Sequence, residues 1–178
     1  EPPGDVKFVL SSEAAHQLLP TIRSRCLGHS MVWPDGSEAD QWLQAQGIKP
    51  ADTAALLRAA GGRPDDALAF VQSGGDPKSW SLLPRAMARG DAGALAGLTP
   101  AQAVDALQKL CHDLLAVKAG AAPRFFEAAE LPPATGLGAL GAWGRELART
   151  ARTVEHPFNS GLMLESLASQ AHRAIRLP

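Results

Sequence analysis

The sequence has no tyrosine, only two cysteines and no long hydrophobic run. Cys26 and Cys111 lie far apart and form no CxxC pattern, and no HxxxH spacing occurs, so we expect neither a disulfide framework nor a zinc site. Two lone thiols fit a reducing cytoplasm. Because a bilayer-spanning helix needs about 20 apolar residues, the sequence predicts no membrane segment. Its glycines fall at expected helix ends and in linkers, not in a phosphate-binding loop.

The chain also lacks an excess of charge of either sign. Seventeen basic and 18 acidic side chains leave a formal net charge of -1 over 178 residues. This balance argues against a strongly basic nucleic-acid surface, but not against a part that helps other subunits to hold DNA. Hydrophobic residues make up 46% of the chain, which is ordinary for a soluble globular protein with one domain or two small ones.

Strand-like segments are scarce, and both lie near the N-terminus. The run "VKFVL" (6–10) is rich in β-branched and aromatic residues and suits a strand buried in a parallel sheet, and "HSMVW" (29–33) is a weaker candidate. A parallel sheet needs more strands, and the chain starts with "EPPGD" instead of Met or a signal peptide. We therefore expect a piece of a longer protein whose other strands precede residue 1.

Short helices are predicted around these strands and after them. Ser12 can cap a helix over 13–18, and Pro20 suits the first turn of the next helix. From residue 37 three Pro- or Ser-started and Gly-ended segments predict a small three-helix module. These segments cover 37–47, 50–62 and 63–75, with a linker at 73–79.

Longer amphipathic helices are predicted in the last hundred residues. Residues 79–98 predict one or two helices, with Pro84 as a kink or boundary, and the next helix, over 99–120, opens with a Thr-Pro cap. Two more are predicted over 137–156 and 160–176, and together the apolar stripes predict a bundle of about five helices. The expected fold class is therefore mainly α, with a short α/β remnant at the N-terminus.

The polar residues of the sequence form no recognisable catalytic set. Asp65 and Asp66 start a helix, where negative charge suits the helix dipole. Cys111 and His112 are adjacent on a helix and differ by about 100° in direction, so we expect an inert buried thiol and not a dyad. The remaining histidines show no metal-ligand spacing, and these are His16, His29, His156 and His172.

Arg23 and Arg25 stand out because they follow the predicted strand directly. Arginines are usually solvated surface groups, but the carboxyl ends of parallel strands are where α/β proteins place working groups. Two arginines at i and i+2 point to different sides of a helix. One can anchor the helix while the other projects outward.

The stretch "VKFVLSSEAAHQLLPTIRSRC" resembles the end of the AAA+ module of sliding-clamp loader subunits. A sensor-1 strand there precedes a short helix with a Ser-Arg-Cys motif, matched by Ser24, Arg25 and Cys26. "CHDLL" and "EHPFNSGLMLESL" resemble loader subunits of bacterial DNA polymerase III. The resemblance implies three domains: an AAA+ remnant over 1–34, a lid over 35–76 and a collar, or oligomerisation domain, over 77–178.

Within that family the Ser-Arg-Cys arginine acts in trans as an arginine finger. The resemblance implies that Arg25 reaches the ATP-Mg bound by a neighbouring subunit, with Ser24 and Cys26 supporting the motif and Arg23 as possible support. Asp65 stands where ATP-hydrolysing relatives carry a sensor-2 arginine, in "GRPDDAL". The implied chain binds no cofactor or metal and is not itself catalytic.

The implied partners are the tau/gamma and delta subunits of the loader, and the sliding clamp and primed DNA through the complex. One alternative is the tau/gamma ATPase subunit itself, against which Asp65 argues. Another is an unrelated all-helical protein-interaction domain. Apolar collar residues can serve either assembly or the domain's own core, and both readings stay open for Trp80, Leu83, Phe158, Leu162 and Met163.

Overall fold

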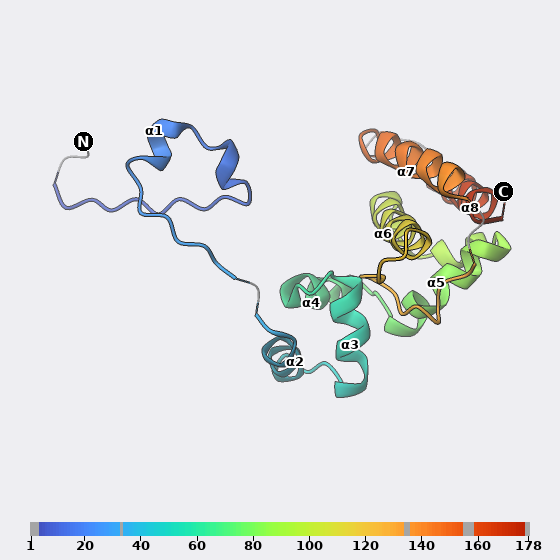
Figure 1. The fold of residues 1–178 in the computed structure, drawn as a ribbon. Coiled ribbons are helices and arrows are strands. Elements are labelled where there is room, and N and C mark those ends of the chain that lie inside the picture. Colours follow the sequence, from blue (N-terminus) through green and yellow to red (C-terminus); the bar gives the residue numbers. More distant parts are fainter. Residues whose placement is uncertain (1–3, 33, 134–135, 155–158, 177–178) are drawn as a thin grey trace. The chain divides into compact units, whose positions relative to one another are not determined.

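A computed structural model describes residues 4–32, 34–133, 136–154 and 159–176. The chain divides into two compact units, Glu1–Val32 and Trp33–Pro178, and each is described by itself. The described residues form eight α-helices and two short 3-10 helices, with no strand (Figure 1). The mainly α fold class is therefore confirmed. None of the described helices is long and apolar enough to cross a membrane.

Residues 4–32, the described part of the first unit, contain two short helical turns. The 3-10 helix η1 spans Ala15–Gln17, and α1 spans Pro20–Arg23 with Pro20 at its first position. The predicted helix over 13–18 is thus wrong in extent. Ser12 Oγ does accept the N–H of Ala14 at 3.1 Å, as an N-cap side chain would, but only a single 3-10 turn follows it.

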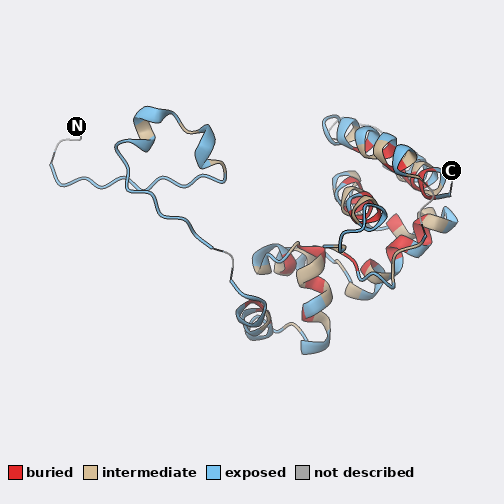
Figure 2. Ribbon diagram, in the orientation of Figure 1, coloured by how far each residue is buried: buried red, intermediate tan, exposed pale blue. Residues whose placement is uncertain are grey.

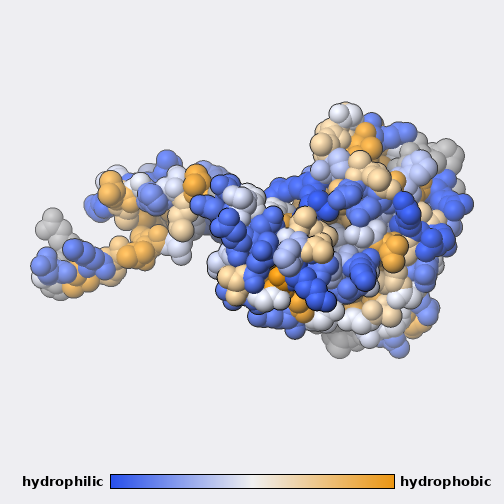
Figure 3. Space-filling view, turned by 90° about the horizontal axis from the view of Figure 1, so that it is seen from below, coloured by the Kyte–Doolittle hydropathy of each residue, from blue (hydrophilic) through white to orange (hydrophobic). Residues whose placement is uncertain are grey.

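The predicted strands at 6–10 and 29–33 are wrong for the described residues, which exclude residue 33. Neither segment makes a backbone hydrogen bond within the described part of the chain, and a strand requires a partner for its N–H and C=O groups. The apolar side chains stay exposed, with Val9 95% and Val32 89% accessible. Figure 3 shows such orange side chains along this unit.

The second unit begins with a three-helix module formed by α2 (Gly36–Ala45), α3 (Pro50–Ala59) and α4 (Pro64–Gln72). Asp35, and not the predicted Ser37, caps α2 by accepting the N–H of Glu38 at 2.8 Å. The module has its own small core, whose buried members are Leu43, Leu56, Ala60 and Ala67.

Four α-helices and η2 (Ala92–Leu95) form a bundle after the module. These are α5 (Pro77–Arg89), α6 (Pro100–Lys118), α7 (Leu137–Ala151) and α8 (Ser160–Arg176). Buried residues line the facing sides of these helices, with α6 in contact with both α7 and α8 (Figure 2). The predicted Thr-Pro start of α6 is confirmed, since Thr99 and Gln102 form a reciprocal capping box.

Helix α5 departs from prediction at both proline positions. It starts at Pro77, so the linker is shorter than 73–79, and it runs through Pro84, which is buried and is no boundary.

The C-terminal end of α5 is tied to α8. His172 Nδ1 and Arg176 Nε both donate to the carbonyl of Ala88, at 2.9 and 3.0 Å, which satisfies an otherwise orphan helix-end acceptor.

Asp76 caps α5, and this cap generates a pH prediction. Its Oδ2 accepts the backbone N–H of Ser79 and the Ser79 hydroxyl, each at 2.8 Å, and these bonds hold its pKa below the usual value. The stabilisation is fully present above the unfolded pKa, about 3.9, and is lost as pH falls through the lowered folded pKa. Asn also caps well but does not titrate. We therefore expect the free energy of unfolding of wild type to exceed that of Asp76→Asn at neutral pH, and the gap to close in acid.

Urea titrations at a series of pH values measure this gap. Asp5→Asn is the matched control, because Asp5 caps no helix. A gap that is the same at neutral and acid pH would show that the Asp76 charge contributes nothing to the cap.

Candidate functional site

The turn after α1 carries the residues of the Ser-Arg-Cys motif. Ser24 Oγ and Arg25 Nη1 both donate to the carbonyl of Thr21, at 3.2 and 3.3 Å, and both side chains are exposed. The Arg25 guanidinium therefore lies against its own turn through one long hydrogen bond. A phosphate oxygen, which forms shorter charge-assisted and bidentate bonds, can displace that contact readily.

Arg23 and Cys26 do not join this contact. Arg23 is the last residue of α1 and Cys26 follows the turn, and both are exposed. Neither side chain makes a polar contact within the described part of the chain, and the Cys26 thiol is free. The structure thus brings Ser24 and Arg25 together on one acceptor and leaves the other two motif residues apart.

Asp65 lies in the first turn of α4, where it is exposed. Its neighbour Asp66 forms an ion pair with Nε of Arg63, the residue that precedes the helix. Both carboxylates suit the positive end of the helix dipole, as the sequence predicts. A negative charge, and not an arginine, is therefore presented at the start of this helix.

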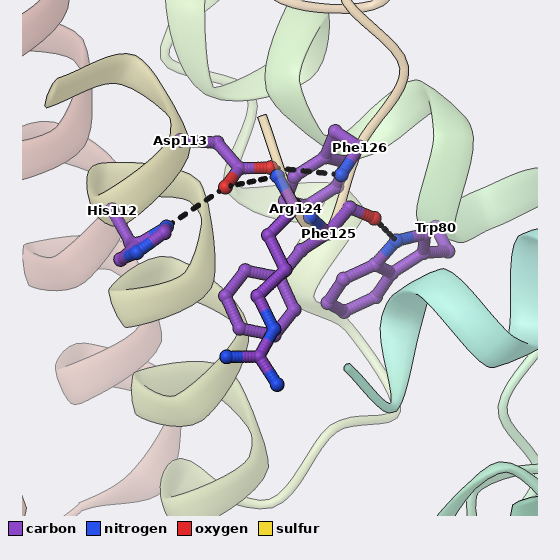
Figure 4. A network of polar contacts seen from close by, with 6 residues as sticks. All are labelled: Trp80, His112, Asp113, Arg124, Phe125 and Phe126. Atoms are coloured by element: carbon purple, nitrogen blue, oxygen red, sulfur yellow. Dashed lines mark hydrogen bonds and ion pairs between the residues drawn. The ribbon is translucent and has the colours of Figure 1, made fainter. Parts of the chain in front are cut away.

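A buried carboxylate in α6 organises a network of polar contacts (Figure 4). Asp113 is fully buried, and it accepts three consecutive backbone N–H groups. Its Oδ1 takes the N–H of Arg124 at 2.9 Å, and its Oδ2 takes those of Phe125 and Phe126 at 2.7 and 2.9 Å. Three charge-assisted bonds offset the cost of burying the carboxylate and fix residues 124–126 on α6.

The segment 121–131 is held by α5 as well. Trp80 Nε1 donates to the carbonyl of Phe125 at 3.2 Å, and its ring stacks on Phe126 with centroids 4.7 Å apart. Arg85 Nη2 donates to the carbonyl of Ala129 at 3.0 Å. The segment is therefore anchored to two helices of the bundle by both backbone and side-chain contacts.

The same segment reaches the three-helix module. Arg124 Nη2 donates to the carbonyl of Gly61 at 3.0 Å, and Glu127 pairs with Arg58 of α3 at 2.6 Å. Gly61 has a φ of +64° and ends α3, and a Cβ there would approach the Phe125 ring at 3.1 Å. Residues 121–131 thus form a brace that joins the module to the bundle.

Sequence reasoning missed this network, although a signal was present. Asp113 sits three residues after Leu110 and next to Leu114, on the apolar stripe of α6. A carboxylate on a buried stripe needs donors, and the "PRFF" segment that follows the helix supplies them.

The Cys111 and His112 pair behaves as the helix geometry predicts. Cys111 is buried and its Sγ lies 3.4 Å from the carbonyl of Leu140, whereas the His112 side chain is 55% exposed. His112 Nδ1 is instead 2.9 Å from Asp113 Oδ1. Burial raises the pKa of the Cys111 thiol to about 11, so the thiolate is scarce at neutral pH.

The structure shows which of the apolar residues considered for assembly are instead buried in the core of the bundle. Trp80 and Leu83 are buried in the bundle core, so neither is available for assembly. Met163 packs partly against that core, while Leu162 is 65% exposed. Phe158 lies outside the described residues.

These residues define a helical protein whose candidate functional groups are exposed charged side chains and not a buried catalytic set. Two curated proteins resemble the chain. It is 37% identical over 73 residues to DNA polymerase III subunit delta' of Escherichia coli (strain K12), and the matched stretch covers 40% of this chain and 22% of that protein. It is 35% identical over 48 residues to the delta' subunit of Buchnera aphidicola subsp. Baizongia pistaciae (strain Bp), which covers 27% and 14%.

The similarity to delta' is confirmed over these stretches, and it agrees with the resemblance to loader subunits found in the sequence motifs. The matched stretches span less than a quarter of either relative. No protein-family model matches this chain.

The network predicts a large loss of stability for Asp113→Ala. Removing the carboxylate leaves three buried N–H groups without their acceptor, and we expect a loss of about 3 kcal/mol or more in the free energy of unfolding. Asp105→Ala, on the exposed face of the same helix, removes only a surface pair with Lys109 and costs about 0.5 kcal/mol.

Urea denaturation measures both variants, and amide hydrogen exchange at residues 124–126 identifies the cause. Equal losses for the two variants, with protection at 124–126 unchanged, would show that the Asp113 bonds do not hold the segment.

The two thiols are predicted to differ in reactivity. In the native chain, iodoacetamide at mildly alkaline pH should modify exposed Cys26 and spare Cys111, whose thiol is buried and has a raised pKa. In urea both should react at similar rates. Peptide mass analysis measures the two sites separately, and rapid native labelling of Cys111 would contradict the description of a closed core.

Proposed function

We propose that this chain acts as a delta'-type subunit of a sliding-clamp loader. The observation that carries the proposal is the agreement of two features. Part of the chain is similar to curated delta' subunits, and an exposed turn carries Ser24, Arg25 and Cys26 in the loader motif. Its partners in this proposal are the tau/gamma and delta subunits, with the clamp and primed DNA held by the whole complex.

Arg25 is the residue that acts in trans. Its guanidinium is exposed and, among the described residues, contacts only the carbonyl of Thr21 at 3.3 Å, so it is available to a neighbouring subunit. A guanidinium is always charged and donates two parallel N–H bonds, which suits the γ-phosphate of ATP-Mg bound by that neighbour. Arg25 thereby neutralises charge that develops during phosphoryl transfer. Ser24 supports the turn, while Arg23 and Cys26 have supporting roles in the same motif.

Asp65 supports a subunit that does not use ATP itself. A carboxylate at the start of α4 repels a nucleotide phosphate, whereas an arginine there would attract it. This position favours a delta'-type subunit over the tau/gamma ATPase. The bundle of α5 to α8 serves as the collar that packs against other subunits, and exposed Leu162 is its remaining apolar candidate.

The proposal predicts that Arg25→Ala sharply lowers ATP hydrolysis in a loader reconstituted with its partner subunits, while assembly stays intact. Arginine fingers contribute roughly 10³-fold or more to the rate at the site they serve. Arg25→Lys keeps the charge but loses the fork, so it restores only part of the rate. Arg23→Ala is the matched control, since it removes an equal charge from the same turn, and we expect a smaller effect.

Steady-state ATPase rates and gel filtration measure activity and assembly together. If the Arg25→Ala loader assembles and hydrolyses ATP at the wild-type rate, the finger assignment is wrong. The unrelated all-helical interaction domain, the competing class, predicts that result.

A further inference from the structure

Helix α7 and its C-cap residue carry three arginines on the outward face, with Arg145 and Arg149 in the helix and Arg152 directly after it. Leu140, Trp143 and Leu147 are its buried residues and turn toward the core. Arg145, Arg149 and Arg152 are all exposed. At 3.6 residues per turn, the direction of each arginine around the helix axis differs by about 120–140° from that of the nearest of the three buried residues. The directions of the three arginines fall within about 60° of one another. Figure 2 shows this outward side of α7 in pale blue. We call these three residues the basic face.

The basic face is little neutralised. Arg149 Nη1 lies 3.1 Å from Glu146 Oε2, in a pair whose side chains are 73% and 48% exposed. Such surface pairs contribute only about 0.3–0.5 kcal/mol, so Arg149 exchanges partners easily. Within the described ranges, Arg145 and Arg152 form no ion pair.

The rest of this face is small and smooth. Gly138, Gly141 and Ala142 precede the arginines on the same side of α7. A Cβ at Gly141 would stand 3.7 Å from Arg145 Nη1, so the guanidinium lies back along the helix over this glycine. An extended anion can therefore approach the helix closely without meeting a bulky side chain.

We propose that the basic face of α7 binds the phosphate backbone of double-stranded nucleic acid without reading its sequence. A protein partner would need apolar or aromatic side chains at the centre of the contact, and this face has none beside its arginines. Single strands are held by stacking on aromatic side chains, which the face also lacks. The face has no amide, and the hydroxyls of flanking Thr150 and Thr153 already donate to the carbonyls of Glu146 and Thr150, so neither is free to donate to a base edge.

The arginines can reach neighbouring phosphates through their long side chains. Positions 145 to 152 span about 10.5 Å along the helix axis, whereas the two steps between three successive phosphates of one duplex strand rise about 7 Å. Guanidinium groups bind phosphate oxygens bidentately. The proposal goes beyond the arginine finger, because it requires neither ATP nor a neighbouring subunit, and it leaves Arg25 uninvolved.

The test is a titration of a short fluorescent DNA duplex of arbitrary sequence with the full 178-residue chain, followed by anisotropy at several salt concentrations. Three phosphate contacts predict a slope of log K against log [salt] of about -2.7, which is about a 40-fold loss of affinity between 50 and 200 mM salt. The triple variant Arg145→Ala/Arg149→Ala/Arg152→Ala should abolish salt-dependent binding. Alanine favours helix, so circular dichroism should show α7 intact.

Matched variants make the result specific. Lys7→Ala/Lys49→Ala/Lys78→Ala removes the same charge from other exposed positions and should leave the slope unchanged. Glu146→Gln frees Arg149 and should strengthen binding. Arg25→Ala should bind the duplex as wild type does, so failure of the finger and failure of the basic face are told apart.

Equal losses in the two triple variants, or no duplex binding by wild type at low salt, overturn the proposal. Arginine-dependent binding of a polyglutamate peptide in place of the duplex also overturns it, because the partner is then an acidic protein.

Discussion

The carboxylate of Asp113 is the contact on which the larger unit depends. It accepts three consecutive N–H groups from residues 124–126, and that segment in turn contacts α5 and the end of α3. A buried charge needs such donors, and a buried loop backbone needs such an acceptor, so each satisfies the other. The consequence is that the three-helix module and the bundle share one brace.

The candidate functional groups are not part of this brace. Arg25 stands on an exposed turn of the first unit, and the basic face stands on the outer side of α7. A group that acts on another molecule must be reachable, and long arginine side chains supply reach while the helices below supply position. The apolar interior therefore contributes to function by positioning these exposed groups. Cys111 and Trp80 lie in that interior, so both side chains serve the packing of the core.

Local sequence rules predicted the helices well, because caps and apolar spacing act within a few residues. Thr99 with Gln102 and the stripe of α6 are examples. The rules failed where partners lie far along the chain. Residues 6–10 have strand composition but no strand to pair with among the described residues, and Asp113 meets donors that are 11 to 13 positions away. The position after the predicted strand indicates both Arg23 and Arg25, and only the family resemblance favours Arg25, since one arginine on a turn has no physical signature that separates it from a solvated one.

The central claim is that Arg25 completes an ATP site on another chain. A structure of the assembled loader with a non-hydrolysable ATP analogue tests it most directly. The account predicts Nη atoms of Arg25 about 2.7–2.9 Å from γ-phosphate oxygens of the neighbouring subunit's nucleotide, with the bond to Thr21 released. An assembled loader in which Arg25 still rests on Thr21 and faces solvent, with the neighbour's nucleotide bound, would contradict the account.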